Sequence, residues 1–172
     1  VYSRFKGFEF DCYDDWASMG IDRDVTLFAY PHTHIGDISV ETKTDGSVNV
    51  DATVVNAQKD SHLEYTLTDA KGNMVAEGNR MQVANPYLWT AETPYLYNLT
   101  VKLKNKKKAI QTFTQKVGIR EIDIDGNILK VNGKPVKLRG VTCHATDPAT
   151  VKVISETLTK MDMKLMKEAS VN

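Results

Sequence analysis

Three aspartates lie close together near the start of the chain, next to a tryptophan. Asp11, Asp14 and Asp15 precede Trp16 in the stretch FDCYDDWASMG. Carboxylates are strong hydrogen-bond acceptors and hard oxygen ligands, so this cluster could bind a cation or the hydroxyl groups of a sugar. From spacing alone, a solvated acidic loop is the simpler interpretation.

A cysteine and a histidine follow a hairpin-like stretch later in the chain. Cys143 and His144 come directly after VNGKPVKLRGVT. His144 follows a predicted strand end, and taken alone it is interpreted as a surface or capping histidine. Cys143 and Cys12 have neither zinc spacing nor the density of a disulfide framework, so we expect two free, partly buried thiols.

Other candidate motifs favour structural interpretations. His32 and His34 would share one face of a strand as half of a metal site, but no third ligand is evident. The sequon at Asn98 falls inside a predicted strand, and the lysines of 105–108 lack interleaved aromatic residues that would stack on bases. We find no P-loop, GxGxxG, GxSxG or HExxH motif.

The composition excludes several classes of partner. Lys and Arg number 22 and balance 22 Asp and Glu. This balance gives no electrostatic case for binding nucleic acid or an anionic membrane, and no apolar run approaches the roughly 20 residues that span a bilayer. The sequence has no initiator Met and no leader pattern, so we expect it to belong to a longer protein.

Period-two patterns dominate the middle of the chain. In SVNVDATVV, valines alternate with Asn49, Asp51 and Thr53, as in a half-buried strand. Repeated short strands separated by turn signals predict a mainly β fold, a β-sandwich, with Trp89 and Tyr97 as candidate core residues. The predicted strands are 25–31, 35–42, 47–57, 63–69, 74–78, 80–84, 96–103 and 109–118.

A hairpin and a helix are predicted after the sandwich. Three strands are predicted at 119–125, 127–131 and 135–140. Asn132-Gly133, a pair typical of a type I′ turn, connects the second to the third. Ser155 can cap a helix whose apolar stripe needs a partner surface; the stripe comprises Leu158, Met161, Leu165, Met166 and Ala169. No Gly or Pro stop signal follows, so the helix is expected to remain open at Asn172.

Three ordered stretches resemble glycoside hydrolase family 2, and most of all its β-galactosidases. They are DDWASMGIDRDV, LWTAETPYLY, and VGIREIDIDGNILKVNGKPVKLRGV followed by DMKLMKEASVN. The resemblance implies that residues 1–30 end a sugar-binding jelly-roll domain and that 31–121 form an immunoglobulin-like β-sandwich domain. Residues 122–172 would be the hairpin, first strand and first helix of a truncated (β/α)8 (TIM) barrel.

The resemblance also implies site residues. Asp14 aligns with the family's aspartate near the galactosyl hydroxyls and a monovalent cation, and His144 aligns with its sugar-contacting histidine. The family's N-R-H-E-H is replaced here by Thr142-Cys143-His144-Ala145-Thr146. Both catalytic glutamates would lie beyond Asn172, and Glu168 is expected to be a solvated helix residue, so the segment by itself should be inactive.

The implied parent is a bacterial enzyme of carbohydrate metabolism that hydrolyses terminal β-D-galactosides with retention. It would act in the cytoplasm or periplasm as a homo-oligomer, with Mg and Na as cofactors, none of them held by this segment alone. Its partners would be the remaining domains and a carbohydrate. Two alternatives stay open: a segment of a β-glucuronidase or β-mannosidase, and a stand-alone immunoglobulin-like binding module, which would have no use for the hairpin and helix.

Overall fold

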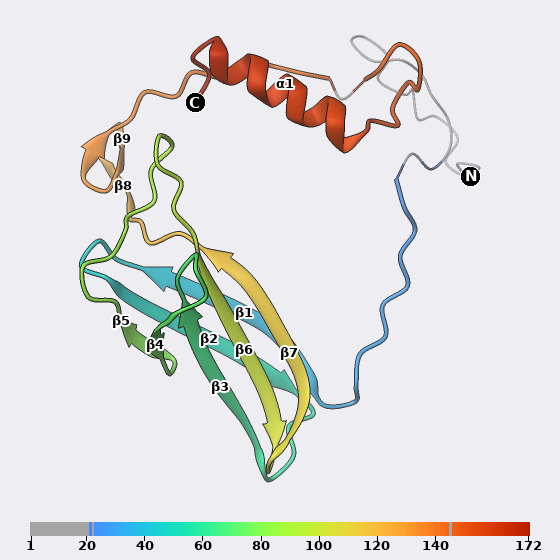
Figure 1. Cartoon of the computed structure of the whole chain (residues 1–172), viewed down its shortest axis with the longest axis vertical. Helices are drawn as coiled ribbons and strands as arrows, with labels where there is room; N and C mark the ends of the chain where they lie inside the picture. The colour runs from blue at the N-terminus through green and yellow to red at the C-terminus, as the bar shows by residue number, and fades with distance from the viewer. Residues whose placement is uncertain (1–20, 22, 145) are drawn as a thin grey trace. The chain divides into compact units, whose positions relative to one another are not determined.

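The computed structural model describes residues 21, 23–144 and 146–172 (Figure 1). They divide into two compact units. One is Ala29–Lys137, and the other combines Leu138–Asn172 with the described residues up to Phe28. Within the described part, the single helix is too short and too polar to cross a membrane.

Two antiparallel sheets build most of the first unit. One sheet has the strand order β1-β2-β5, and the other has the order β4-β3-β6-β7 (Figure 1). The strands are β1 His34–Thr42, β2 Ser47–Val55, β3 Ser61–Thr68, β4 Met74–Glu77, β5 Arg80–Gln82, β6 Tyr97–Asn105 and β7 Lys108–Val117. The predicted period-two stretches from Ile35 onward therefore form strands in the expected order.

The core lies between the inward faces of these sheets. Val48 and Val50 of β2 are fully buried, as predicted from their alternation with polar residues. Leu99 of β6 is also fully buried, and it pairs with the fully buried Leu67 of β3. One cluster includes residues from both sheets, so the mainly β sandwich is confirmed. Tyr97 is buried as expected, whereas Trp89 is only half-buried.

The predicted strand at 25–31 is wrong. This segment contains no strand, and the side chains of Val25 and Leu27 are 81% and 96% exposed. Its short apolar run, stopped by Pro31, is typical of a strand in sequence. A strand also needs a neighbouring strand to receive its backbone hydrogen bonds, and no ladder in the described part includes this segment.

A separate three-stranded sheet follows the sandwich in the first unit. Its order is β10-β9-β8, formed by β8 Ile122–Asp125, β9 Ile128–Val131 and β10 Lys134–Pro135. Asn132 and Gly133 have φ values of 50° and 73°, which confirms the predicted turn. β10 is shorter than the predicted 135–140. Its partner β9 begins at Ile128, so the ladder ends once the Val136 N–H has reached the Leu129 carbonyl.

Helix α1, Glu156–Glu168, belongs to the second unit. The Ser155 hydroxyl accepts a hydrogen bond from the Leu158 N–H at 3.1 Å, which confirms the predicted cap. The expectation of an open helix at Asn172 is wrong. Ser170 adopts a left-handed φ of 62°, and the N–H groups of Ser170 and Val171 return to the last turn of the helix. No residue of α1 is buried by the described part of the chain.

Candidate functional site

In the second unit an extended run without regular structure leads through a loop into helix α1. The chain runs without regular structure from Leu138 to His144, enters a loop and then forms α1. After the helix it returns to Arg139: the Asn172 N–H donates to the Arg139 carbonyl at 3.1 Å, and the Asn172 side-chain oxygen accepts from the Arg139 N–H at 2.8 Å. These two bonds join the residues after α1 to the run that precedes it.

His144 lies at the carboxyl end of that run, where barrel enzymes place their active-site loops. Its side chain is exposed. Cys143 beside it is a free, exposed cysteine whose sulfur lies 3.6 Å from the His144 carbonyl oxygen. The expectation of a partly buried thiol is therefore wrong for Cys143, because no described element covers this run. Cys12 and the aspartates at 11, 14 and 15 lie outside the described residues.

The loop after His144 is tightly built. The backbone groups of Asp147 and Val151 exchange hydrogen bonds of 2.7 and 2.8 Å. The Asp147 carboxylate also accepts from the N–H of Thr150 at 3.0 Å, and Val151 has a φ of 58°, which is rare for a β-branched residue. The Arg23 guanidinium donates to the Lys152 carbonyl at 2.7 Å. Hydrogen bonds at several points therefore hold the shape of this loop.

The two-histidine metal site is not formed. His32 lies in a bend before β1, so it shares no strand face with His34. The His34 ring stacks on Tyr30 with centroids 5.3 Å apart, and its Nδ1 lies 2.9 Å from the Pro31 carbonyl. Within residues 21, 23–144 and 146–172, no group of three His, Cys, Asp or Glu side chains could hold a metal ion.

The remaining candidate motifs lie in ordinary elements of the fold: a strand, a hairpin turn and a helix. Asn98 lies within β6, and Lys106 adopts a φ of 51° in the tight turn between β6 and β7, as predicted for a hairpin turn. Glu168 is exposed at the end of α1, 3.9 Å from Lys164, which confirms a solvated helix residue. None of these positions gathers chemical groups around a ligand.

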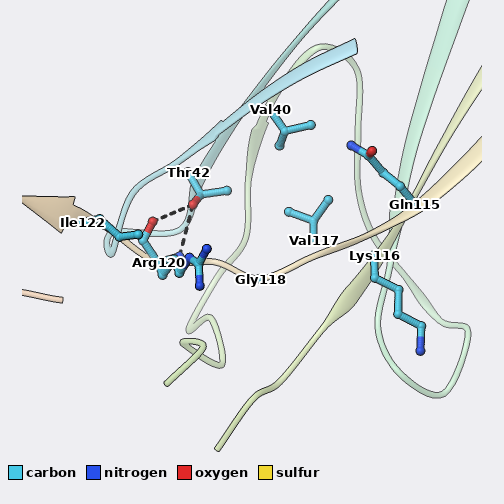
Figure 2. Close-up of a pocket in the computed structure, with 8 residues that line it drawn as sticks. All are labelled: Val40, Thr42, Gln115, Lys116, Val117, Gly118, Arg120 and Ile122. Carbon is cyan, nitrogen blue, oxygen red and sulfur yellow. Dashed lines mark hydrogen bonds between the residues drawn. The ribbon is translucent and has the colours of Figure 1, made fainter. Parts of the chain in front are cut away.

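The junction between the sandwich and the hairpin was missed by sequence reasoning. An open groove of about 390 Å³ lies there between β1 and β7 (Figure 2). Figure 2 shows the Thr42 hydroxyl facing the backbone of Arg120, donating to its carbonyl at 2.7 Å and accepting from its N–H at 3.1 Å. The Arg120 guanidinium lies 4.3 Å from the centre of the Trp89 ring. These contacts join residues far apart in the sequence, so no local pattern indicates them.

Glu121 forms a second anchor at this junction. Its carboxylate accepts hydrogen bonds from the Thr44 hydroxyl and, at 3.0 Å, from the Thr44 N–H. These bonds hold the pKa of Glu121 below its ordinary value, because they favour the charged form. The junction is therefore a polar attachment point, with its acceptors and donors matched.

Two family models match the chain in succession. The model for glycosyl hydrolases family 2 matches residues 33–120, and the model for the TIM barrel domain of the same family matches residues 122–172. The first range contains the whole sandwich, and the second contains the hairpin, the loop with His144 and α1.

Named relatives agree with the family models. A β-galactosidase of Halalkalibacterium halodurans is 31% identical and matches 100% of this chain, and one of Lactococcus lactis is 36% identical over 95%. The chain spans 19% and 17% of these relatives' lengths. A crystal structure of Ruminococcus gnavus β-glucuronidase with uronic isofagomine matches 83% of this chain and 24% of its own, with a TM-score of 0.72 and 28% identity. The chain belongs to family 2 of the glycosyl hydrolases.

Proposed function

We propose that this chain is a non-catalytic segment of a β-galactosidase that hydrolyses terminal β-D-galactosides with retention. The observation that carries the proposal is the similarity to proteins named β-galactosidase, at 31–36% identity over 95–100% of the chain. This similarity runs through the sandwich, the hairpin and α1. In this proposal, residues 31–121 are a supporting domain and residues 122–172 begin the barrel.

His144 and Asp14 are the sugar-binding residues of the proposal. The position of His144 at the start of the loop before α1, within the range matched by the family's barrel model, supports its role, since barrel active sites form from loops that follow strands. An imidazole there would donate or accept a hydrogen bond with a sugar hydroxyl. Asp14 is proposed as a sugar-binding residue because its sequence motif resembles that of the family. A carboxylate at that position would accept hydrogen bonds from sugar hydroxyls and leave the imidazole to bind others.

The two carboxylates of a retaining mechanism lie elsewhere in this proposal. Such enzymes use an acid/base and a nucleophile about 5–5.5 Å apart. The family's two glutamates match no position of this chain, so the chain alone should not hydrolyse a galactoside. Addition of a chromogenic β-galactoside to the purified 172-residue chain should release no product above the uncatalysed rate.

The cation sites of the parent are likewise proposed to lie mainly outside this segment. The described residues offer no group of three suitable side chains, so they do not form a metal site by themselves. Asp14 would contribute one carboxylate to a monovalent cation in the parent. No step of the proposed reaction is assigned to a metal, and a homo-oligomeric parent remains part of the proposal.

A β-glucuronidase is the second candidate. The solved structure at TM-score 0.72 is a β-glucuronidase, and its 28% identity is only slightly below that of the β-galactosidases. The two candidates differ in the sugar's C6 group, which is a hydroxymethyl in galactosides and a carboxylate in glucuronides, and in the C4 hydroxyl, which is axial in galactosides and equatorial in glucuronides. A site built for one should discriminate against the other at least about hundredfold.

A panel of substrates tests the proposal in the full-length protein. The values of kcat/KM are measured for the nitrophenyl β-galactoside, β-glucuronide and β-mannoside. The proposal expects the galactoside to exceed the other two by at least about hundredfold. Preference for the glucuronide would transfer the assignment to the second candidate, and no hydrolysis of any of the three would overturn both.

A further inference from the structure

Asn132 makes three hydrogen bonds at the base of the hairpin. Its backbone N–H donates to the Glu121 carbonyl at 2.9 Å, and its side-chain Oδ1 accepts from the Glu121 N–H at 3.0 Å. Its Nδ2 donates to the carbonyl of Trp89 at 3.0 Å. The side chain therefore joins the end of β9, the residue before β8 and the loop between β5 and β6 of the sandwich.

Trp89 is itself held firmly at the end of the sandwich. Its N–H donates to the Ile119 carbonyl at 2.9 Å, and its ring lies under the Arg120 guanidinium. A Cβ atom at Gly118 would lie only 2.9 Å from the Trp89 Cβ, so the two backbones approach as closely as glycine allows. A hydrogen bond to the Trp89 carbonyl is therefore a bond to a fixed point of the sandwich.

A second set of hydrogen bonds connects residues 119–121 to the end of β1 and the turn after it. Thr42 brackets the backbone of Arg120, and Thr44 donates twice to the Glu121 carboxylate (Figure 2 shows the first of these anchors). Residues 119–121 thus have partners from the β1 side and from the Trp89 loop. Asn132 is the residue that extends this attachment from the connecting segment to the hairpin itself.

We propose that Asn132 is a positioning residue whose side-chain amide clamps the hairpin to the sandwich and so restrains the residues from which the chain continues to His144. A turn residue alone would need only a positive φ, which Gly supplies as well as Asn. The clamp needs an acceptor for Glu121 and, on a separate atom, a donor for Trp89, and the side-chain amide of Asn132 supplies the two on neighbouring atoms. The catalytic part of this proposal rests on the proposed glycosidase function.

Three variants of the 172-residue chain separate a clamp from a turn. Asn132→Gly keeps the turn and removes both side-chain bonds. Asn132→Asp keeps the acceptor and replaces the donor, so a carboxylate oxygen faces the Trp89 carbonyl. Asn85→Gly is the matched control: Asn85 also has a positive φ, 49°, and its side chain makes no hydrogen bond with the described residues.

Amide hydrogen exchange gives the first measurement. The clamp predicts that exchange at the backbone amide of Trp89 becomes about tenfold faster in both Asn132 variants, because both lose the hydrogen bond to the Trp89 carbonyl. Exchange at the amide of Glu121 should become faster in Asn132→Gly, which removes its acceptor, and not in Asn132→Asp, which keeps it. Exchange at the core amide of Leu99 should stay unchanged, and Asn85→Gly should match the wild type throughout. Equal exchange in Asn132→Gly and the wild type would overturn the clamp.

Kinetics of the full-length enzyme give the second measurement. We expect both Asn132 variants to raise KM for the nitrophenyl β-galactoside at least threefold, because the run that ends at His144 continues directly from the hairpin and is less restrained when the hairpin is released. A variant that was merely less stable would lower the apparent kcat and leave KM unchanged. Faster junction exchange with an unchanged KM would overturn the positioning role. If the wild type hydrolyses no galactoside, the proposed function fails, and the exchange result still decides the clamp.

Discussion

Gly118→Ala is a severe test of the junction geometry. An ideal Cβ at this position lies 2.9 Å from the Trp89 Cβ and 3.0 Å from its Cγ and Cδ1. The Trp89 Cβ cannot rotate away, because it is bonded directly to the backbone. That backbone is in turn tied to Ile119 by the 2.9 Å hydrogen bond from the Trp89 N–H. The added methyl group must therefore push two backbone segments apart.

The expected cost follows from two opposing effects. Overpacking a well-packed site costs about 1–3 kcal/mol. Replacement of Gly by Ala also reduces the entropy of the unfolded chain and contributes about 0.4–1 kcal/mol of stability where φ is compatible. Gly118 has no positive φ, so this gain applies. We expect a net loss of about 1–2 kcal/mol in the free energy of unfolding, or roughly 5–10 °C in Tm for a unit of about 100 residues.

Thermal unfolding of the 172-residue chain, followed by circular dichroism, measures this loss. Gly140→Ala is the control, because a Cβ there has no neighbour within 4 Å. The control should stay within about 0.5 kcal/mol of the wild type. An unchanged or higher Tm for Gly118→Ala would show that Trp89 and Gly118 are not in close contact, and the anchor for the clamp would be lost with it.

Three further predictions concern the core, the effect of pH and the sugar loop. Leu99→Ala should cost about 2–5 kcal/mol in urea unfolding because Leu99 is fully buried, whereas Phe113→Ala, at a position 41% exposed, should cost less than half as much; equal costs would contradict the assigned core. Because hydrogen bonds from Thr44 lower the pKa of folded Glu121, the unfolded chain takes up this proton at higher pH than the folded chain. The free energy of unfolding, measured from pH 6 to pH 3, should therefore decline below the ordinary pKa of 4.5, and Glu121→Gln should flatten that decline; a rise would refute the assignment. In the full-length enzyme, His144→Ala should lower kcat/KM for the galactoside at least about tenfold, and wild-type kinetics would remove His144 from the site.

Much of the sandwich was predictable because the sequence patterns that determine its strands and turns are local. Alternation of apolar and polar residues places Val48, Val50 and Leu99 on inward faces whatever strand lies beside them. The Asn132-Gly133 turn and the Ser155 cap are equally local, since each depends on one or two residues.

The errors have the opposite origin. Residues 25–31 form a short apolar run typical of a strand, but no described ladder includes them. The helix stops at a left-handed Ser170, a position that glycine usually fills, so the search for Gly and Pro signals missed it.

The candidate site was only partly accessible from sequence. The candidate role of His144 followed from the resemblance, and the structure adds that His144 ends an exposed run without regular structure and lies before the loop that leads into α1. The junction could not be predicted, because Thr42 and Arg120 are 78 positions apart and both look like ordinary strand-end residues. The hydrogen bond between Asn132 and Trp89 was not predicted for a further reason. The turn alone already explained why an asparagine stands at position 132.

A structure of the full-length protein with a galactose-like inhibitor tests the central claim most directly. The measurement is the distance from the His144 ring nitrogens to the hydroxyl oxygens of the bound sugar. The account predicts one such distance within hydrogen-bonding range, at or below about 3.2 Å. An inhibitor bound at the catalytic glutamates, with no hydroxyl in direct or water-bridged contact with His144, would contradict it.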